Sequence, residues 1–110
     1  MTELEQERLT EADVSQMQVN AAEAANMLKS LGHEGRLMLL CHLVTGEKTV
    51  GDLAQRLGCR QAAVSQQLSR LRMDGLVTPR REGQTIWYSL ADNRTQLVLE
   101  LLHDIYCDSV

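Results

Sequence analysis

The sequence predicts a mainly helical fold with one small β-hairpin. Apolar residues recur at helical spacing through most of the chain, whereas the alternation typical of strands is found over 76–81 and 84–90. A compact pair of helical segments with a tight turn between them comes directly before these strands. These observations predict the order helix, helix, helix, helix, strand, strand, helix, which is that of a winged helix-turn-helix.

The first part of the chain is expected to hold a tail and two helices. Residues 1–13 have few apolar positions and no period, which predicts a mobile acidic tail followed by a single DNA-binding and dimerisation domain, 14–110. Apolar side chains keep helical spacing over 14–31, where several alanines would let another helix approach closely. Gly32 ends this helix, which we interpret as a packing or dimer helix, and a second helix covers 34–44.

The helix-turn-helix is expected in the next thirty or so residues. Residues 45–48 are interpreted as a short turn, after which a compact third helix over 50–57 stops at Gly58. A fourth helix follows over 61–73, with aliphatic residues inward and short, mostly uncharged polar residues outward. This arrangement is typical of helices that read the major groove of DNA.

The hairpin and a last helix complete the domain. The two strands turn at Glu82-Gly83, and basic side chains lie near this tip. Asp92 can accept hydrogen bonds from the first backbone N–H groups of a final helix, expected over 93–106.

The outer face of the fourth helix and the hairpin tip supply candidate DNA contacts. Glutamine can form paired hydrogen bonds with adenine, and serine can form hydrogen bonds with several base edges. Arginine contacts phosphates or enters the minor groove. An ordinary solvated helix face could show the first of these features and an ordinary basic turn the second. A polar helix followed by a basic hairpin, however, favours binding to duplex DNA. The candidates are Gln61, Ala62, Ser65, Gln66, Ser69 and Arg70 on the helix, and Arg80, Arg81 and Gln84 on the hairpin.

Charge and composition restrict the remaining classes of function. The net charge is −4, but residues 48–94 carry eight bases and four acids, so a basic centre lies within an acidic total. No secretory signal or apolar run of about 20 residues occurs, which predicts a cytoplasmic protein without membrane contact. The sequence has no pairing of nucleophile and base and no phosphate-binding glycine loop, so we expect neither an enzyme nor a cofactor.

Three segments resemble the ArsR-type family of bacterial repressors: LGHEGRLMLLCHL (31–43), VGDLAQRLGCRQAAVSQQLSRLRMDGLV (50–77) and RREGQTIWYSL (80–90). The resemblance spans about 25–107 and implies a homodimer with the first and last helices at its interface. It also implies that operator DNA is bound until an inducer weakens the complex. Matching positions imply base-side contacts by Gln61, Ser65 and Gln66 and wing contacts by Arg80 and Arg81. Arg60 stands where many members have a serine that caps the reading helix.

The cysteines suggest the inducer. Cys41 and Cys107 match the positions of two cysteines in the ArsR-type subgroup that senses persulfides and other reactive sulfur species. That resemblance implies a disulfide or longer sulfur bridge between them, which lowers DNA affinity. Burial among apolar residues at position 41 and nearby acids at position 107 both disfavour the thiolate, so the sequence alone does not explain their reactivity.

Two other interpretations of the cysteines remain open. Metal-sensing members use a cysteine pair that would fall at 41 and 43, but position 43 is leucine, and we commit to no metal ligand. A metal site on the last helix is the alternative, because its candidate ligands have spacings of three and four residues; these are Glu100, His103, Asp104 and Cys107. A general thiol-oxidation sensor is the other alternative. Cys59, in the turn before the fourth helix, is expected to pack as a small structural residue.

Overall fold

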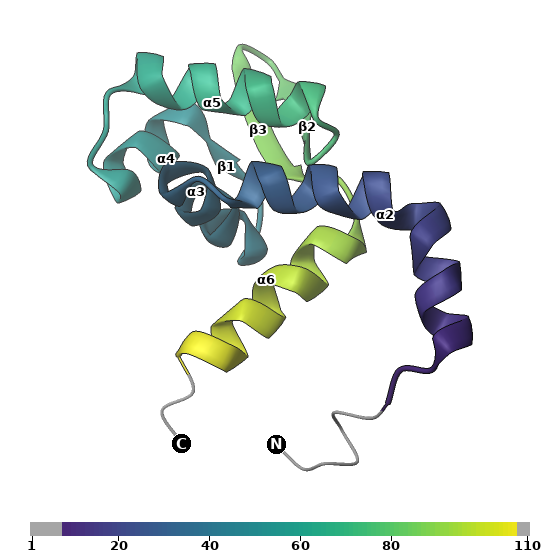
Figure 1. Cartoon of the computed structure of the whole chain (residues 1–110). Helices are drawn as coiled ribbons and strands as arrows, with labels where there is room; N and C mark the ends of the chain where they lie inside the picture. The colour runs from purple at the N-terminus through teal and green to yellow at the C-terminus, as the bar shows by residue number, and fades with distance from the viewer. Residues whose placement is uncertain (1–7, 108–110) are drawn as a thin grey trace.

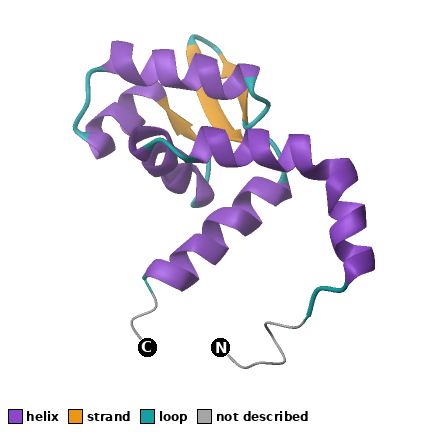
Figure 2. Cartoon of the chain, viewed as in Figure 1, coloured by secondary structure: helices purple, strands orange, loops and turns teal. Residues whose placement is uncertain are grey.

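The computed structural model describes residues 8–107, and over this range it has five helices and one three-stranded sheet (Figures 1 and 2). The predicted winged helix-turn-helix is confirmed. None of these helices is both long enough and apolar enough to span a bilayer. In chain order the elements are α2 (Glu11–Leu31), α3 (Glu34–Val44), β1 (Lys48–Thr49), α4 (Val50–Leu57), α5 (Gln61–Met73), β2 (Val77–Glu82), β3 (Thr85–Leu90) and α6 (Asn93–Tyr106).

The strand β1 is absent from the sequence prediction, which placed a turn over 45–48. Lys48 and Thr49 pair antiparallel with Tyr88 and Trp87, so the strand order is β1-β3-β2. Two residues are too few to show an alternating pattern, and pairing with a distant strand decides their conformation. The buried Lys48 Nζ donates hydrogen bonds of 3.1 Å to Thr45 Oγ1 and to the Gly46 carbonyl. This ties the end of α3 to the sheet.

Helix α2 begins three residues before the predicted position 14. Thr10 caps it: the Asp13 N–H donates to Thr10 Oγ1 at 3.2 Å, and the Thr10 N–H donates to Asp13 Oδ2 at 2.9 Å. This capping box stabilises the first turn, and the hydrogen bonds from the Thr10 backbone and side chain lower the pKa of Asp13. Part of the predicted tail is therefore helical, and residues 1–7 lie outside the described residues.

The core is aliphatic, as expected for a chain without phenylalanine. Helices α3, α4 and α5 supply most of it, and β2 covers one side. Leucines at the centre are completely buried, and burying one such side chain contributes about 1.5–3 kcal/mol. These leucines are Leu39, Leu40, Leu53, Leu68 and Leu71.

Helices α2 and α6 bury little of their apolar surface. They extend from the body formed by α3, α4, α5 and the sheet (Figure 1). We call six of their exposed apolar side chains the α2–α6 face: Val14, Met17, Leu28, Leu97, Leu101 and Ile105. So much exposed apolar surface on neighbouring helices is typical of a contact surface.

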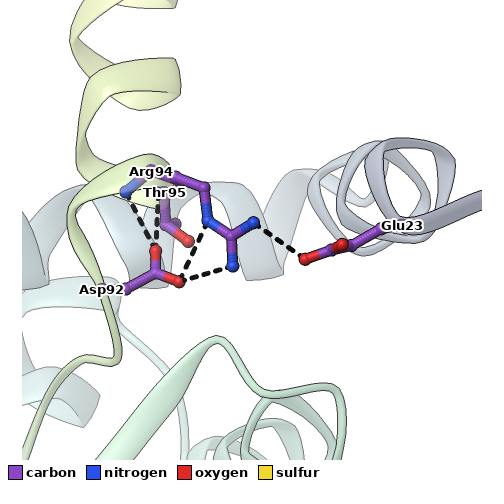
Figure 3. Close-up of polar contacts among 4 residues, drawn as sticks. All are labelled: Glu23, Asp92, Arg94 and Thr95. Atoms are coloured by element: carbon purple, nitrogen blue, oxygen red, sulfur yellow. Dashed lines mark hydrogen bonds and ion pairs between the residues drawn. The ribbon is translucent and has the colours of Figure 1, made fainter. Parts of the chain in front are cut away.

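A polar cluster joins α2 to the start of α6 (Figure 3). Asp92 Oδ1 accepts hydrogen bonds from the backbone N–H groups of Arg94 at 2.9 Å and Thr95 at 3.3 Å. The Arg94 guanidinium donates to Asp92 Oδ2 and, at 2.8 Å, to Glu23 Oε1 of α2. Hydrogen bonding from the Arg94 side chain is the main reason that the pKa of Asp92 is lowered. The predicted cap at Asp92 is confirmed.

Candidate DNA interface and cysteine pair

A left-handed glycine forms the turn between α4 and α5. Gly58 ends α4 with φ of 67°, and the Cys59 N–H donates to the Ala54 carbonyl at 3.0 Å. Only glycine adopts this conformation without strain, which is why the chain can reverse within three residues. Arg60 is the N-cap of α5 and makes no side-chain capping hydrogen bond, so the missing serine noted in the sequence has no substitute.

The outward face of α5 presents every helix residue predicted to contact DNA. Val64, Leu68 and Leu71 are buried and fix the orientation of the helix. The predicted contacts are all exposed: Gln61, Ala62, Ser65, Gln66, Ser69 and Arg70. The end of the helix is tied to α2, because Ser30 Oγ donates to Asp74 Oδ2 at 2.9 Å and Arg70 Nε lies 3.5 Å from the same oxygen.

The hairpin carries two arginines in different surroundings. Arg80 Nη2 and Nε donate to the two carboxylate oxygens of Glu47 at 2.6 and 3.2 Å, and Nη1 donates to Glu82 Oε2 at 3.2 Å. These bonds raise the pKa of Arg80 and lower that of Glu47. Arg81 is exposed and forms no ion pair within residues 8–107, and Gln84 is also exposed. Sequence reasoning missed Glu47, since nothing local marks a partner 33 residues away.

Cys41 and Cys107 lie on two elements that pack together, α3 and the end of α6. Cys41 is half-buried on α3, and Cys107 is exposed at the end of α6, where its N–H donates to the His103 carbonyl at 2.7 Å. Both are free thiols. Burial raises the pKa of the Cys41 thiol, and the negative charge of the Cys107 thiolate raises it further.

A hollow of about 460 Å³ opens beside Cys41, between α3 and α6. The rest of its lining comes from Val44, Leu99, Glu100, His103 and Asp104. His103 Nδ1 lies 3.7 Å from Asp104 Oδ1. Over the residues that the structure describes, no three His, Cys, Asp or Glu side chains are arranged to hold a metal ion. The alternative metal site on the last helix thus does not form within one protomer.

The expectation that Cys59 packs as a structural residue is wrong. Its side chain is exposed, and its Sγ lies 3.6 Å from the Leu57 carbonyl. The tight turn after Gly58 leaves this position on the outer side of the chain, away from the core.

An exposed polar helix after a glycine turn, followed by a hairpin with basic residues, defines a winged helix-turn-helix transcriptional regulator. The bacterial regulatory protein, arsR family, pattern matches residues 33–78. The transcriptional activator HlyU of Vibrio cholerae is 42% identical over 97 residues, which cover 88% of this chain and 90% of that protein. The biofilm growth-associated repressor of Agrobacterium fabrum is 45% identical over 91 residues, or 83% and 78% of the two chains. The chain belongs to the arsR family of bacterial regulatory proteins.

A solved structure agrees with this assignment. The transcriptional repressor BigR from Xylella fastidiosa superposes with a TM-score of 0.80 at 43% identity. The match covers 84% of this chain and 95% of that chain.

Proposed function

We propose that the chain is a homodimeric repressor whose affinity for operator DNA falls when sulfane sulfur joins Cys41 to Cys107. The observation that carries this proposal is the packing of α6 against α3, which sets two free thiols, the half-buried Cys41 and the exposed Cys107, on neighbouring elements. Two of the similar proteins are named repressors and one is named an activator. We propose repression because two of the three names give that direction of regulation.

The exposed face of α5 is the surface that reads DNA. Gln61 and Gln66 have the length and the paired donor and acceptor groups that recognise adenine, Ser65 and Ser69 reach base edges, and Ala62 leaves room for a thymine methyl. Arg70 and Arg81 contact the backbone, and Gln84 reaches the neighbouring minor groove. Arg80 is left out of these contacts, because its guanidinium is already paired with Glu47 and Glu82.

The α2–α6 face pairs two copies of the chain. It is apolar, it lies on neighbouring helices, and one protomer leaves it exposed. Two α5 helices related by a two-fold axis must lie about 34 Å apart, one turn of DNA, to enter successive major grooves, which predicts a near-palindromic operator.

Exposure orders the two cysteines in the sulfur reaction. A persulfide donor RSSH meets Cys107 first, because that side chain is exposed whereas Cys41 is half-buried. The Cys107 thiolate bonds to the outer sulfur of the donor, the donor's S–S bond breaks, and RS⁻ leaves and takes up the released proton. Cys107 is then a persulfide, and the donor is reduced to RSH.

Cys41 completes the bridge. Its thiolate bonds to the Cys107 sulfur, the persulfide S–S bond breaks, and HS⁻ leaves, which oxidises the cysteine pair by two electrons. If both cysteines carry a persulfide, the terminal sulfur of one attacks the cysteine-bound sulfur of the other, and the product is a trisulfide plus HS⁻. A disulfide requires Cα atoms about 4.4–6.8 Å apart, and each added sulfur extends the reach by about 2 Å.

A bridge between α3 and α6 changes the geometry of the dimer. It ties the end of α6 to the body, and α6 contributes Leu97, Leu101 and Ile105 to the α2–α6 face. Arg94 transmits a shift of α6 to α2 through Glu23. The bridged dimer then presents its two α5 helices at a spacing that fits the operator less well.

The test is operator binding before and after exposure to a polysulfide donor. An operator duplex is first selected from a random-sequence library with the reduced protein. We expect donor treatment to weaken binding by tenfold or more and a reductant to restore it. Cys41→Ser and Cys107→Ser should bind like the reduced protein and resist the donor, while Cys59→Ser should respond normally. If either of the first two variants still responds, the cysteine bridge is not the switch.

Peroxide distinguishes a sulfur sensor from a general thiol-oxidation sensor. A parallel sample treated with peroxide should keep its operator affinity. An equal loss of affinity in both samples would instead favour the general thiol sensor.

A further inference from the structure

We infer that Arg80 is a positioning residue that holds the wing, β2 and β3, against the turn before β1, and that Arg81 supplies the wing's phosphate contact. The inference deepens the proposed DNA-binding function. It concerns the paired guanidinium of Arg80, which the sequence alone assigned to DNA.

Arg80 reaches across the whole sheet. The strand order β1-β3-β2 places β3 between Arg80 and the segment that carries Glu47. Neighbouring strands are about 4.8 Å apart, so the Arg80 and Glu47 side chains together span about 10 Å. Side chains alternate along a strand, so Arg80 and Glu82 share one face of β2 and Arg81 points to the other. One arginine thus joins the two edge strands.

The pair has the geometry of a strong ion pair. Two N–O distances of 2.6 and 3.2 Å join the guanidinium of Arg80 to both oxygens of Glu47. Such bidentate contacts fix the orientation of both side chains. The Arg80 and Glu47 side chains are 49% and 38% exposed. The contact therefore contributes order rather than much stability, since solvent screens the attraction between exposed charges.

The charges around Arg80 disfavour a phosphate contact. Glu47 and Glu82 both contact its guanidinium, so this cluster carries one positive and two negative charges. A phosphate that approached Arg80 would have to displace the carboxylate of Glu47 and would meet that of Glu82. Within residues 8–107 no carboxylate forms an ion pair with Arg81, which makes it the better electrostatic match to DNA.

Trp87 lies beneath this contact and can report on it. In the sheet register Trp87 stands opposite both Arg80 and Thr49, and directly opposite residues project from the same face. Its indole Nε1 is buried and has no hydrogen-bond partner within residues 8–107. Trp87 is also the single tryptophan of the chain. Quenching of its fluorescence therefore measures how well the Arg80–Glu47 contact shields the indole ring from solvent.

The test compares Glu47→Gln, Arg80→Gln, their combination, and Arg81→Gln as the matched control. Acrylamide quenching of Trp87 is measured without DNA. Glu47→Gln and Arg80→Gln should each raise the quenching constant by a similar factor, about twofold. The combination should add little to either, because both substitutions remove the same contact. Arg81→Gln should leave quenching unchanged.

Binding to a mixed-sequence DNA duplex over a range of salt concentrations supplies the second measurement. Arg81→Gln should reduce the slope of log K against log salt by about 0.9 for each phosphate that the protein no longer neutralises. Glu47→Gln and Arg80→Gln should weaken binding by similar factors and keep the slope. Unchanged quenching in Arg80→Gln would overturn the inference. It would also be overturned if Arg80→Gln reduced the salt slope while Glu47→Gln bound DNA more tightly, because Arg80 would then contact phosphate itself. If the unaltered protein showed no salt-dependent binding, the DNA-binding function itself would fail, while the quenching result would still decide the role of Arg80.

Discussion

Replacing Leu101 with glutamate should separate the two protomers of the proposed dimer. Leu101 is 57% exposed at the middle of α6, within the α2–α6 face. Full burial of a leucine is worth about 1.5–3 kcal/mol, so covering the exposed part contributes about 1–1.5 kcal/mol in each protomer. Two-fold symmetry uses the residue twice, which gives about 2–3 kcal/mol in total. Since 1.4 kcal/mol is a factor of ten, the dimer should dissociate about 100-fold more readily.

Sedimentation equilibrium over a dilution series measures the dissociation constant directly. Met73→Glu is the matched control, because Met73 is 83% exposed at the end of α5 and lies outside the α2–α6 face. Circular dichroism should show that both variants keep their helices. An unchanged dissociation constant for Leu101→Glu would refute the assignment of the α2–α6 face to dimerisation.

Three further predictions concern the pH dependence of the bridge and the stability of the fold. The raised pKa of Cys41 keeps its thiol protonated near neutral pH. The rate of bridge closure, measured by mass spectrometry, should therefore increase with pH until the pH exceeds the ordinary thiol pKa of 9.0. A rate that levels off by neutral pH would contradict this. Asp92→Ala removes the cap of α6 and should lower the free energy of unfolding in urea by about 1–2 kcal/mol, whereas an unchanged midpoint would mean the cap contributes nothing. Leu68→Ala should cost about 2–5 kcal/mol in the same assay, because the side chain is completely buried, and a decrease below 1 kcal/mol would show that the core closes over the gap.

The sequence predicted the middle of the chain well because glycine and aspartate mark its boundaries. Gly58 adopts the left-handed conformation at the end of α4, and Asp92 caps α6. The predicted ranges of α4 and α6 agree with the structure for this reason, and those of α3 and α5 agree as well. The start of α2 was missed, although Thr10 and Asp13 form a capping box that an acid three residues after a threonine could have indicated.

The candidate site was predictable where it depends on local periodicity and not where it depends on contacts between distant residues. Helical spacing alone places Ser65 and Gln66 outward and Val64 inward. No local pattern predicts that Arg80 meets Glu47, since three strands must first assemble. The exposure of Cys59 was likewise missed, because it depends on how the turn after α4 faces the core.

The pairing of Cys41 with Cys107 was predicted from resemblance to a family, and no local sequence pattern predicts it. The two residues are 66 positions apart, and only the packing of α6 against α3 sets them on neighbouring elements. The expectation that both settings disfavour the thiolate holds for Cys41, where burial and the charge of Cys107 both raise the pKa.

The connectivity of the cysteines after exposure to a polysulfide donor tests the central claim most directly. Reduced protein is treated, digested without reductant and analysed by mass spectrometry, with non-reducing electrophoresis to separate bridges within and between protomers. The account predicts a Cys41–Cys107 linkage within one protomer, with the loss of two hydrogens and the gain of whole sulfur atoms when the bridge is longer than a disulfide. Unlinked thiols at both positions, or a linkage through Cys59, would contradict it.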